Sequence, residues 1–426
     1  MSSFLTINGI GLIILGLVNR ISLPSGFDKD LRLLLYSMAT RRIALGFLFL
    51  VRSIYFGLLG FSYTEVGLLL SLATLIAAIR QVVFGMLSDR FGRKKFILMG
   101  AFFTTARLII FATRSDFWSL AFGQAVGALG EGSGPGQPVV SGYITDKTSE
   151  ADRPDIFTAL GVSNSLTTSV GFALAGLPSL FETQFGLSMV ESHAWLWWIG
   201  AFFSALSIFF ILPMRDIKSS KKELELTESE NNEHFMGVSS WKDIIKFSLV
   251  RSTSGLGYGL IGSLLPLYFS NRYGVGSEAL GPIYAVSRFV TMFSYLLIPG
   301  LVLRFGEIKA LMWTRLLSAG LTVAFAYIEW YPLALGVLFL YRLIIHFGMP
   351  IRQSFASSLV PSREIATAVG VSNFFRMGFR TIAPTAAGYM FESLCSTLPF
   401  LSGASLVALN AWFYNGFYNG EDELND

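Results

Sequence analysis

Several ionisable side chains lie inside apolar stretches of the chain. Apolar runs of about 20 residues, the length that spans a bilayer as a helix, recur along the sequence. A charged side chain inside such a run is costly unless it faces a partner or a cavity. The basic groups near the middle of a run are Arg52, Arg107, Arg288, Arg342, His346 and Arg376. Glu131 is the only acid well inside a run, so these residues are the first candidates for an interior site.

Glu131 could carry a proton. It lies in the stretch GALGEGSGPGQP, whose glycines and prolines soften the helix, and the freed backbone groups are tolerated only against protein or a wet cavity. A buried carboxyl group takes up a proton more readily than an exposed one. The alternative is a fixed ion pair with Arg52 or another arginine. His346, one turn from Arg342, is a second proton candidate because imidazole titrates near neutral pH.

The composition places these residues in an all-α membrane protein. Of 426 residues, 53% are hydrophobic and only 14% are charged, whereas a soluble protein carries roughly 25% charged residues. The apolar runs predict twelve spans. We expect them near 39–60, 65–84, 96–113, 117–139, 157–180, 194–213, 244–269, 277–300, 308–329, 332–351, 364–391 and 397–416.

The polar segments divide the chain into five parts. Residues 214–243 form the one long polar stretch, with charges of both signs, and predict a cytoplasmic linker between two six-span halves, 39–213 and 244–416. Residues 1–38 predict a cytoplasmic or interfacial segment, and 417–426 an acidic cytoplasmic tail. Lys and Arg gather in the connectors after spans 2, 4, 6 and 8, which places those connectors and both termini in the cytoplasm. We therefore expect a multi-pass protein of the cell membrane.

The two halves carry related sequences. The segment TALGVSN begins at Thr158 and TAVGVSN begins at Thr367, while DRFG from Asp89 is echoed by LRFG from Leu303. Six spans followed by a related six is the arrangement of a transporter built from two parallel, pseudo-symmetric halves. Asn164 and Asn373 occupy matching positions of this repeat. They could bind substrate through their amides or stabilise helix contacts, and the sequence favours neither.

The connector GMLSDRFGRKK between spans 2 and 3 resembles the signature loop of the major facilitator superfamily. The loop matches that signature at Gly85, Asp89, Arg90, Gly92, Arg93, Lys94 and Lys95. The resemblance implies a cytoplasmic gate, in which Asp89 accepts hydrogen bonds from a helix of the other half when that side is closed. Retention of basic loops in the cytoplasm would explain the basic residues alone, but neither Asp89 nor the two glycines.

The same resemblance implies which spans face a central cavity. Spans 1, 4, 7, 8, 10 and 11 would line it, so Arg52, Arg288, Arg342 and Arg376 would give it a positive field. A guanidinium presents a fork of donors that suits carboxylate and phosphate, although each arginine could instead satisfy backbone carbonyls of a broken helix. The short piece around Glu131 also resembles spinster-like members, which implies a role in coupling.

These observations predict secondary transport of a small solute, an organic anion first, by alternating access and coupled to protons. A multidrug or amphiphile exporter is the alternative, although span 5 lacks the Gly-Pro-x-x-Gly-Gly motif of many drug exporters. A receptor or scaffold without flux is the alternative of another class. An enzyme is disfavoured because no H-E-x-x-H or G-x-S-x-G motif is present. We expect a monomer in the lipid bilayer, with no cofactor, metal or nucleic acid.

Overall fold

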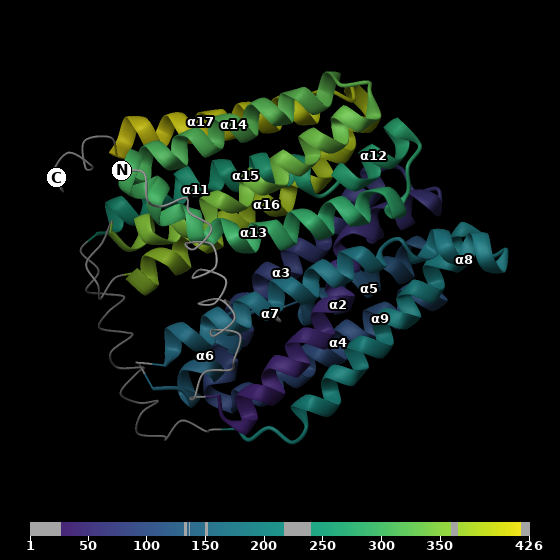
Figure 1. The fold of residues 1–426 in the computed structure, drawn as a ribbon, viewed down its shortest axis with the longest axis horizontal. Coiled ribbons are helices and arrows are strands. Elements are labelled where there is room, and N and C mark those ends of the chain that lie inside the picture. The colour runs from purple at the N-terminus through teal and green to yellow at the C-terminus, as the bar shows by residue number, and fades with distance from the viewer. Residues whose placement is uncertain are drawn as a thin grey trace, which may run out of the picture.

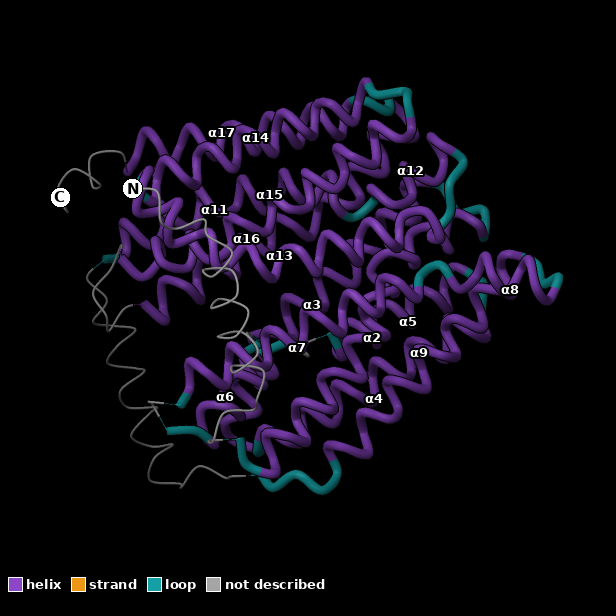
Figure 2. The backbone as a smooth tube through the Cα atoms, viewed as in Figure 1, coloured by secondary structure: helices purple, strands orange, loops and turns teal. Residues whose placement is uncertain are grey.

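The computed structural model describes residues 27–131, 134–135, 137–149, 152–216, 240–358 and 365–418. The predictions for residues 1–26, for most of the linker and for the C-terminal tail lie outside these residues. The side chains of Asp89 and His346 lie outside the described part as well. Within the described ranges the regular structure is helical, and Figure 2 shows helices joined by short loops.

The first half of the chain forms one bundle of helices (Figure 1). Its helices are α2 (Lys29–Leu58), α3 (Tyr63–Phe91), α4 (Arg93–Thr113), α5 (Phe117–Gly130), α6 (Pro138–Lys147), α7 (Arg153–Leu174), α8 (Leu177–Phe185) and α9 (Met189–Ile211).

The second half forms the other bundle. Its helices are α11 (Trp241–Gly262), α12 (Leu265–Tyr273), α13 (Ser277–Phe305), α14 (Glu307–Tyr327), α15 (Tyr331–Ser358), α16 (Ile365–Tyr389), the π-helical turn η2 (Met390–Leu394) and α17 (Leu398–Tyr418).

The first span begins earlier than its apolar run. We expected it from residue 39, but α2 begins at Lys29, because the Asp28 carboxylate accepts a hydrogen bond from the Leu31 amide at 2.7 Å and caps the helix. Such a cap satisfies a backbone N–H that would otherwise have no partner. Polar residues near position 30 therefore belong to the helix, and positions near 40 lie well inside it.

Three of the expected spans are each built from two helices. The expected span 117–139 consists of α5 and α6, which are separated by the glycine- and proline-rich stretch that includes Glu131. The expected span 157–180 contains most of α7 and the start of α8, and the expected span 244–269 contains most of α11 and the first part of α12. Pro178 and Pro266 lie in the first turns of the short helices α8 and α12. Proline begins a helix readily because its missing N–H needs no partner there.

The two bundles contact each other mainly through two helix pairs, α3 with α16 and α7 with α13. Along the first pair the backbones approach closely, since a Cβ atom at Gly67 would lie 3.0 Å from the Thr385 Cα. Ser71 Oγ accepts hydrogen bonds from the Thr385 amide and hydroxyl, at 3.1 and 2.7 Å. These contacts fix the relative position of the two halves.

Contacts between the halves gather at one end of the molecule, which we call the joined end and define by Tyr63, Thr64, Asn271, Phe391 and Glu392. The Tyr63 ring stacks on Phe391 at 5.1 Å between centroids, and its hydroxyl accepts a hydrogen bond from Asn271 Nδ2 at 2.9 Å. Figure 1 shows the two bundles meeting at this end and lying apart at the opposite end, where α3 ends and α11 begins. We call that opposite end the separated end.

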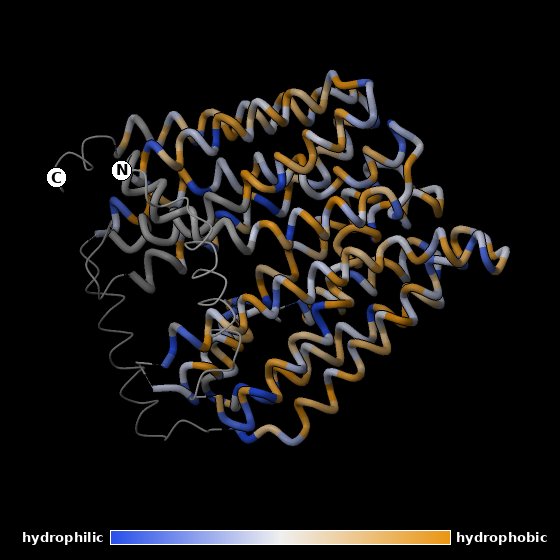
Figure 3. The backbone as a smooth tube through the Cα atoms, in the orientation of Figure 1, coloured by the Kyte–Doolittle hydropathy of each residue, from blue (hydrophilic) through white to orange (hydrophobic). Residues whose placement is uncertain are grey.

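Hydrophobic residues recur along the helices of both bundles (Figure 3), and many large ones lie on the outer faces. Large side chains such as Phe102, Phe122, Phe202 and Trp412 are exposed along them. Five helices of the described part are long and apolar enough by composition alone to cross a membrane. Because such continuous apolar surface is unstable in water, these faces are the surface that contacts lipid.

Candidate functional site

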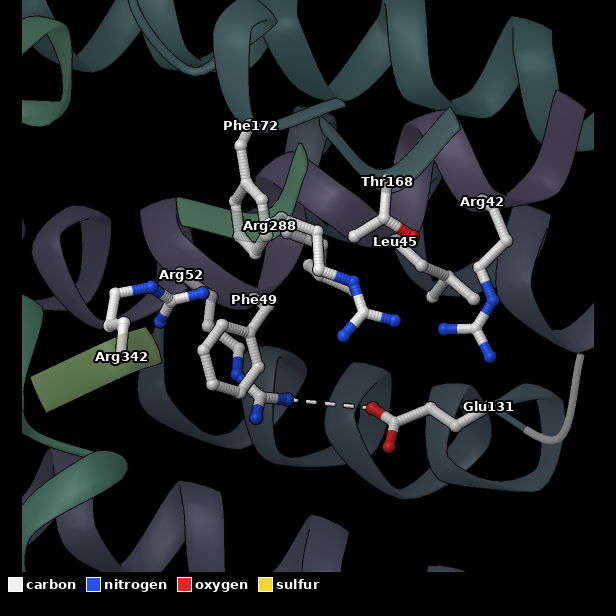
Figure 4. A pocket seen from close by; sticks show the side chains of 10 residues that line it. Arg42, Leu45, Phe49, Arg52, Glu131, Thr168, Phe172, Arg288 and Arg342 are labelled. Atoms are coloured by element: carbon white, nitrogen blue, oxygen red, sulfur yellow. Dashed lines mark hydrogen bonds and ion pairs between the residues drawn. The ribbon is translucent and has the colours of Figure 1, made fainter. Parts of the chain in front are cut away.

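A cavity of about 280 Å³ lies between the two halves. Helices α2 and α7 and the segment that follows α5 supply one wall, and α13 and α15 supply the other (Figure 4). The lining residues are Arg42, Leu45, Leu48, Phe49, Arg52, Glu131, Thr168, Phe172, Arg288 and Arg342. Of the four arginines that the sequence assigned to the cavity, the structure brings together Arg52, Arg288 and Arg342.

Glu131 is held by two guanidiniums of unequal exposure. Its Oε1 accepts a hydrogen bond from Arg107 Nη1 at 2.7 Å and one from Arg52 Nη1 at 3.4 Å. The Arg107 side chain is 0% exposed, whereas Arg52 and Glu131 are 16% and 31% exposed. Burial strengthens such charge-assisted bonds because little water screens them. The contacts favour the carboxylate form of Glu131. In this conformation they form the ion pair with arginine that was the alternative to a proton carrier.

Arg107 reaches Glu131 through a gap left by a glycine. It projects from α4 toward α5, and a Cβ atom at Gly127 would overlap its guanidinium. Only glycine therefore fits at position 127 while Arg107 keeps this position. Arg107 Nε and Nη2 are buried and have no hydrogen-bond partner among the described residues. The sequence placed Arg107 at mid-depth but gave no signal that it is the principal partner of Glu131.

Arg342 lies between aromatic rings from both halves. Its guanidinium carbon is 3.6 Å from the centroid of Tyr284 and 5.4 Å from that of Phe172. Its Nε donates to the Ser287 hydroxyl at 2.8 Å. A cation over the face of a ring is attracted by the negative charge of that face. Arg342 is thus fixed in position at the cavity wall, and Phe172 extends that wall into the first half.

Arg42 is the cavity residue that sequence reasoning missed. If the first span began at residue 39, as expected, Arg42 would lie near a helix end, where an arginine can extend to the membrane surface. Because α2 begins at Lys29, Arg42 instead lies well inside the helix. Its neighbour Arg41 turns the other way and donates through Nη1 to the Ile97 carbonyl at 3.4 Å. In Figure 4 Arg42 and Arg288 point into the same part of the cavity from opposite halves.

The remaining site candidates lie away from the cavity wall. Asn373 Oδ1 accepts a hydrogen bond from Arg251 Nη2 at 3.0 Å, so its amide links α16 to α11. The Asn164 side-chain oxygen is buried, without a hydrogen-bond partner in the described part of the chain. Arg376 is not among the lining residues, and its backbone packs against Gly255 of α11.

The signature loop is attached to its own half in this conformation. Gly92 adopts a φ of +94°, in the region that favours glycine. Arg93 Nε donates to Asp146 Oδ2 at 2.6 Å, and the Lys94 amide donates to Asp216 Oδ1 at 3.2 Å. Lys94 Nζ also donates to the Leu212 carbonyl at 2.7 Å. These bonds tie the loop to α6 and to the end of α9.

Gly85, Arg90 and Lys95 complete the described part of the loop. A Cβ atom at Gly85 would lie 3.6 Å from the Pro138 side chain, in the same half. Arg90 and Lys95 are exposed. The loop therefore lies at the separated end, on the half that contains it.

Comparison with known proteins identifies the family. The chain matches the sequence profile of the Major Facilitator Superfamily over residues 33–413. The chain belongs to the major facilitator superfamily. Its fold is the superfamily fold, with twelve membrane-spanning helices in two pseudo-symmetric halves of six, as the sequence predicted.

The sequence identity to individual proteins that match over most of the chain is low. The uncharacterized membrane protein YJR124C of Saccharomyces cerevisiae is 19% identical over 413 residues, 89% of this chain and 92% of that protein. The structure is similar to that of the nucleoside transporter NupG, with a TM-score of 0.74, 16% identity and coverage of 91% and 99% of the two chains.

A bacterial homolog of the human lysosomal transporter Spinster, solved inward-facing and unoccupied, gives a TM-score of 0.68 at 16% identity, covering 92% and 97%. At such identities the two structural comparisons concern the fold alone. They agree with the resemblance to spinster-like members that the sequence suggested.

Proposed function

We propose that this chain moves a small organic anion across the membrane by alternating access, coupled to protons. The charge of the cavity carries the proposal, since the four guanidiniums of Arg42, Arg52, Arg288 and Arg342 face the single carboxylate of Glu131. Exclusion of water strengthens this field. A cationic solute would be repelled, whereas a carboxylate or phosphate gains charge-assisted hydrogen bonds.

Proton coupling rests on the position of Arg52. This arginine both bonds Glu131 and lines the cavity. When Glu131 is protonated, Arg52 loses its charged partner and can bind an entering anion instead. The anion in turn favours the protonated carboxyl, because it adds a negative charge nearby. Proton and anion therefore bind together, which is the requirement for their coupled movement in the same direction.

The proposed orientation places the separated end in the cytoplasm of a multi-pass protein of the cell membrane. The basic residues of the signature loop lie at that end, and basic connectors remain in the cytoplasm. The halves 39–213 and 244–416 then move against each other as a monomer, connected by the linker 214–243, with both termini in the cytoplasm.

Asp89 belongs to the gate in this proposal. When the separated end closes, its carboxylate accepts hydrogen bonds from the N-terminal end of a helix of the other half, where the helix dipole favours a negative charge. Asp89→Asn should fold normally and slow turnover in reconstituted liposomes, because the neutral amide stabilises the closed state less. An unchanged turnover would remove Asp89 from the gate.

A ligand series of one shape and three charges tests the proposed substrate class. The purified protein is heated with benzoate, benzamide or benzylamine, and with phenyl phosphate as a second anion. We expect benzoate and phenyl phosphate to raise the midpoint of thermal unfolding and the neutral and cationic analogues to leave it unchanged. Uptake of labelled benzoate into liposomes, with and without a pH gradient, then measures transport. Stabilisation by benzylamine alone would contradict the proposal.

An amphiphile exporter is the second candidate, and the apolar part of the cavity favours it. Leu45, Leu48, Phe49 and Phe172 form a wall that could hold the apolar body of a drug. Binding of a lipophilic cation that Glu131→Gln abolishes would establish this candidate over the first. Binding without flux in the same liposomes would instead indicate a receptor.

A further inference from the structure

Arg42 and Arg288 face each other across the cavity from different halves. Arg42 lies on α2 and Arg288 on α13, and Figure 4 shows both guanidiniums directed into the space above Glu131. Two like charges that face each other at a partly buried site repel each other more strongly than in bulk water. An anion placed between them would turn this repulsion into attraction.

Three charged residues that line the cavity, Arg52, Glu131 and Arg342, each have a bonded partner in the structure. Arg52 and Arg107 hold Glu131, and Arg342 is fixed by Tyr284 and Ser287. Arg42, by contrast, has a buried Nε with no hydrogen-bond partner among the described residues. Glu131 is the one carboxylate among the residues that line the cavity. A buried guanidinium donor without a partner is unfavourable, so this part of the cavity suits an incoming acceptor.

The described part of the wall next to these arginines is largely apolar. The Phe49 and Phe172 rings pack edge to face at 6.4 Å, and the Thr168 hydroxyl donates to the Asn164 carbonyl at 2.6 Å. A cavity of about 280 Å³ has room for a small aromatic acid, whereas a long acyl chain would extend beyond its walls. The observations therefore favour a soluble organic acid over a lipid as the source of the anionic group.

We propose that Arg42 and Arg288 form one oxyanion subsite, in which a single carboxylate or phosphate of a small organic acid bridges the two halves while its apolar part contacts Phe49 and Phe172. This inference rests on the proposed function, since it assumes an anionic substrate. It goes further by naming the two residues that bind the anionic head, and by making the substrate a direct link between the halves.

Calorimetric titration of purified protein with benzoate and with phenyl phosphate tests the subsite. Arg42→Gln and Arg288→Gln should each weaken binding about tenfold or more, because each removes a charge-assisted hydrogen bond. The double variant should lose less than the product of the two factors, since both residues act on one head group. Without ligand, Arg42→Gln should not lower the midpoint of thermal unfolding, because removing its charge relieves the repulsion by Arg288.

Arg41→Gln is the matched control. Arg41 is adjacent on α2 and is more buried than Arg42, but it bonds the Ile97 carbonyl and does not line the cavity, so benzoate binding should change less than twofold. Should Arg42→Gln fail to fold, Arg42→Lys keeps the charge and removes the planar fork, and it should still weaken binding severalfold. Titration with oleoyl lysophosphatidate tests whether a lipid supplies the anionic group. We expect no binding of this lipid that depends on Arg42.

The outcomes separate the two proposals. If neither benzoate nor phenyl phosphate binds the unaltered protein, the anion function fails and the subsite fails with it. If both bind, but Arg42→Gln and Arg288→Gln leave the affinity unchanged while Arg52→Gln weakens it, the subsite is refuted and the anion function stands. Binding of the lysophosphatidate through Arg42 and Arg288, with no binding of benzoate, would replace the soluble acid by a lipid and overturn the inference.

Discussion

At the scale of single residues, the Glu131 pair depends on the absence of a side chain at Gly127. Arg107 occupies the position where a Cβ atom of residue 127 would lie. Its bond to Glu131 joins α4 to the end of α5 in a part of the molecule where an unpaired charge is unfavourable. Adding a single methyl group at Gly127 should therefore be enough to disturb the pair.

Gly127→Ala should lower stability by about 1–3 kcal/mol, as overpacking of a close contact does. The methyl group forces Arg107 away from Glu131. The control is Gly320→Ala on α14, where an added Cβ would meet nothing within 4 Å, and where alanine should be neutral or stabilising by about 1 kcal/mol. The midpoints of thermal unfolding of the two variants provide the comparison, and equal midpoints would show that Arg107 is not held as described.

Glu131→Gln tests coupling at the same scale. The amide retains the size of the side chain but cannot exchange a proton, so anion binding should persist and accumulation driven by a pH gradient should be lost. Uptake of labelled benzoate into liposomes, with a gradient and by exchange without one, measures the two activities. Accumulation that still follows the gradient would place the proton site elsewhere, with His346 the next candidate.

At the scale of elements, the joined end is held by a helix cap that one half supplies to the other. The Glu392 carboxylate of η2 accepts a hydrogen bond from the Thr64 amide at the start of α3, at 3.0 Å. Glu392 lies beyond the end of α16, and the hydroxyl and amide of Thr64 lower its pKa. A helix N-terminus favours a carboxylate in this position.

Glu392→Ala should open the joined end more often. The readout is the rate of thiol modification at a cysteine replacing the buried Ala387, with Cys395 changed to serine. The matched control is Glu182→Ala, at the end of the corresponding span of the first half, where the side chain is exposed. The rate should rise severalfold for Glu392→Ala alone, and equal rates would refute the cap.

The same cap should depend on pH in a defined direction. The pKa of Glu392 is lowered in the joined state, so the contact is fully present above the ordinary glutamate value of about 4.3 and is lost as the pH falls through the lowered value. In the background with Ala387→Cys and Cys395→Ser, the modification rate with Glu392 should therefore approach the rate with Glu392→Ala as the pH falls. The ratio of the two rates is the measure, because acid lowers the reactive thiolate fraction equally in both proteins.

The elements were easier to predict from sequence than the directions of their side chains. Apolar runs set the twelve spans, and depth along a run, together with the resemblance to the superfamily, placed Arg52, Arg288 and Arg342 at the cavity that they line. Depth says nothing about rotation around a helix axis, which decides that Arg42 faces the cavity while the adjacent Arg41 faces α4. The start of α2 was missed because a cap by Asp28 outweighs the polar character of its first turn.

At the scale of the whole molecule, the joined and separated ends follow from one arrangement. The halves contact each other through α3 with α16 and α7 with α13, and the bundles diverge toward the end that carries the signature loop (Figure 1). The cavity lies between these ends with arginines from both halves. A ligand shifts such an equilibrium only by binding one state more tightly than the other, and an anion between Arg42 and Arg288 favours the state in which the halves are closer.

The last prediction concerns this movement. Spin labels on cysteines at Asp155 of α7 and Lys242 of α11, both exposed near the separated end, report the distance between the halves in a background with Cys395 changed to serine. Benzoate should shift the distance distribution toward shorter values, because the bridging anion replaces repulsion between the halves by attraction. Benzamide, of the same shape without the charge, should leave the distribution unchanged, and Arg42→Gln should abolish the response to benzoate. A shift of equal size with benzamide would mean that filling the apolar wall, rather than neutralising the two arginines, draws the halves together.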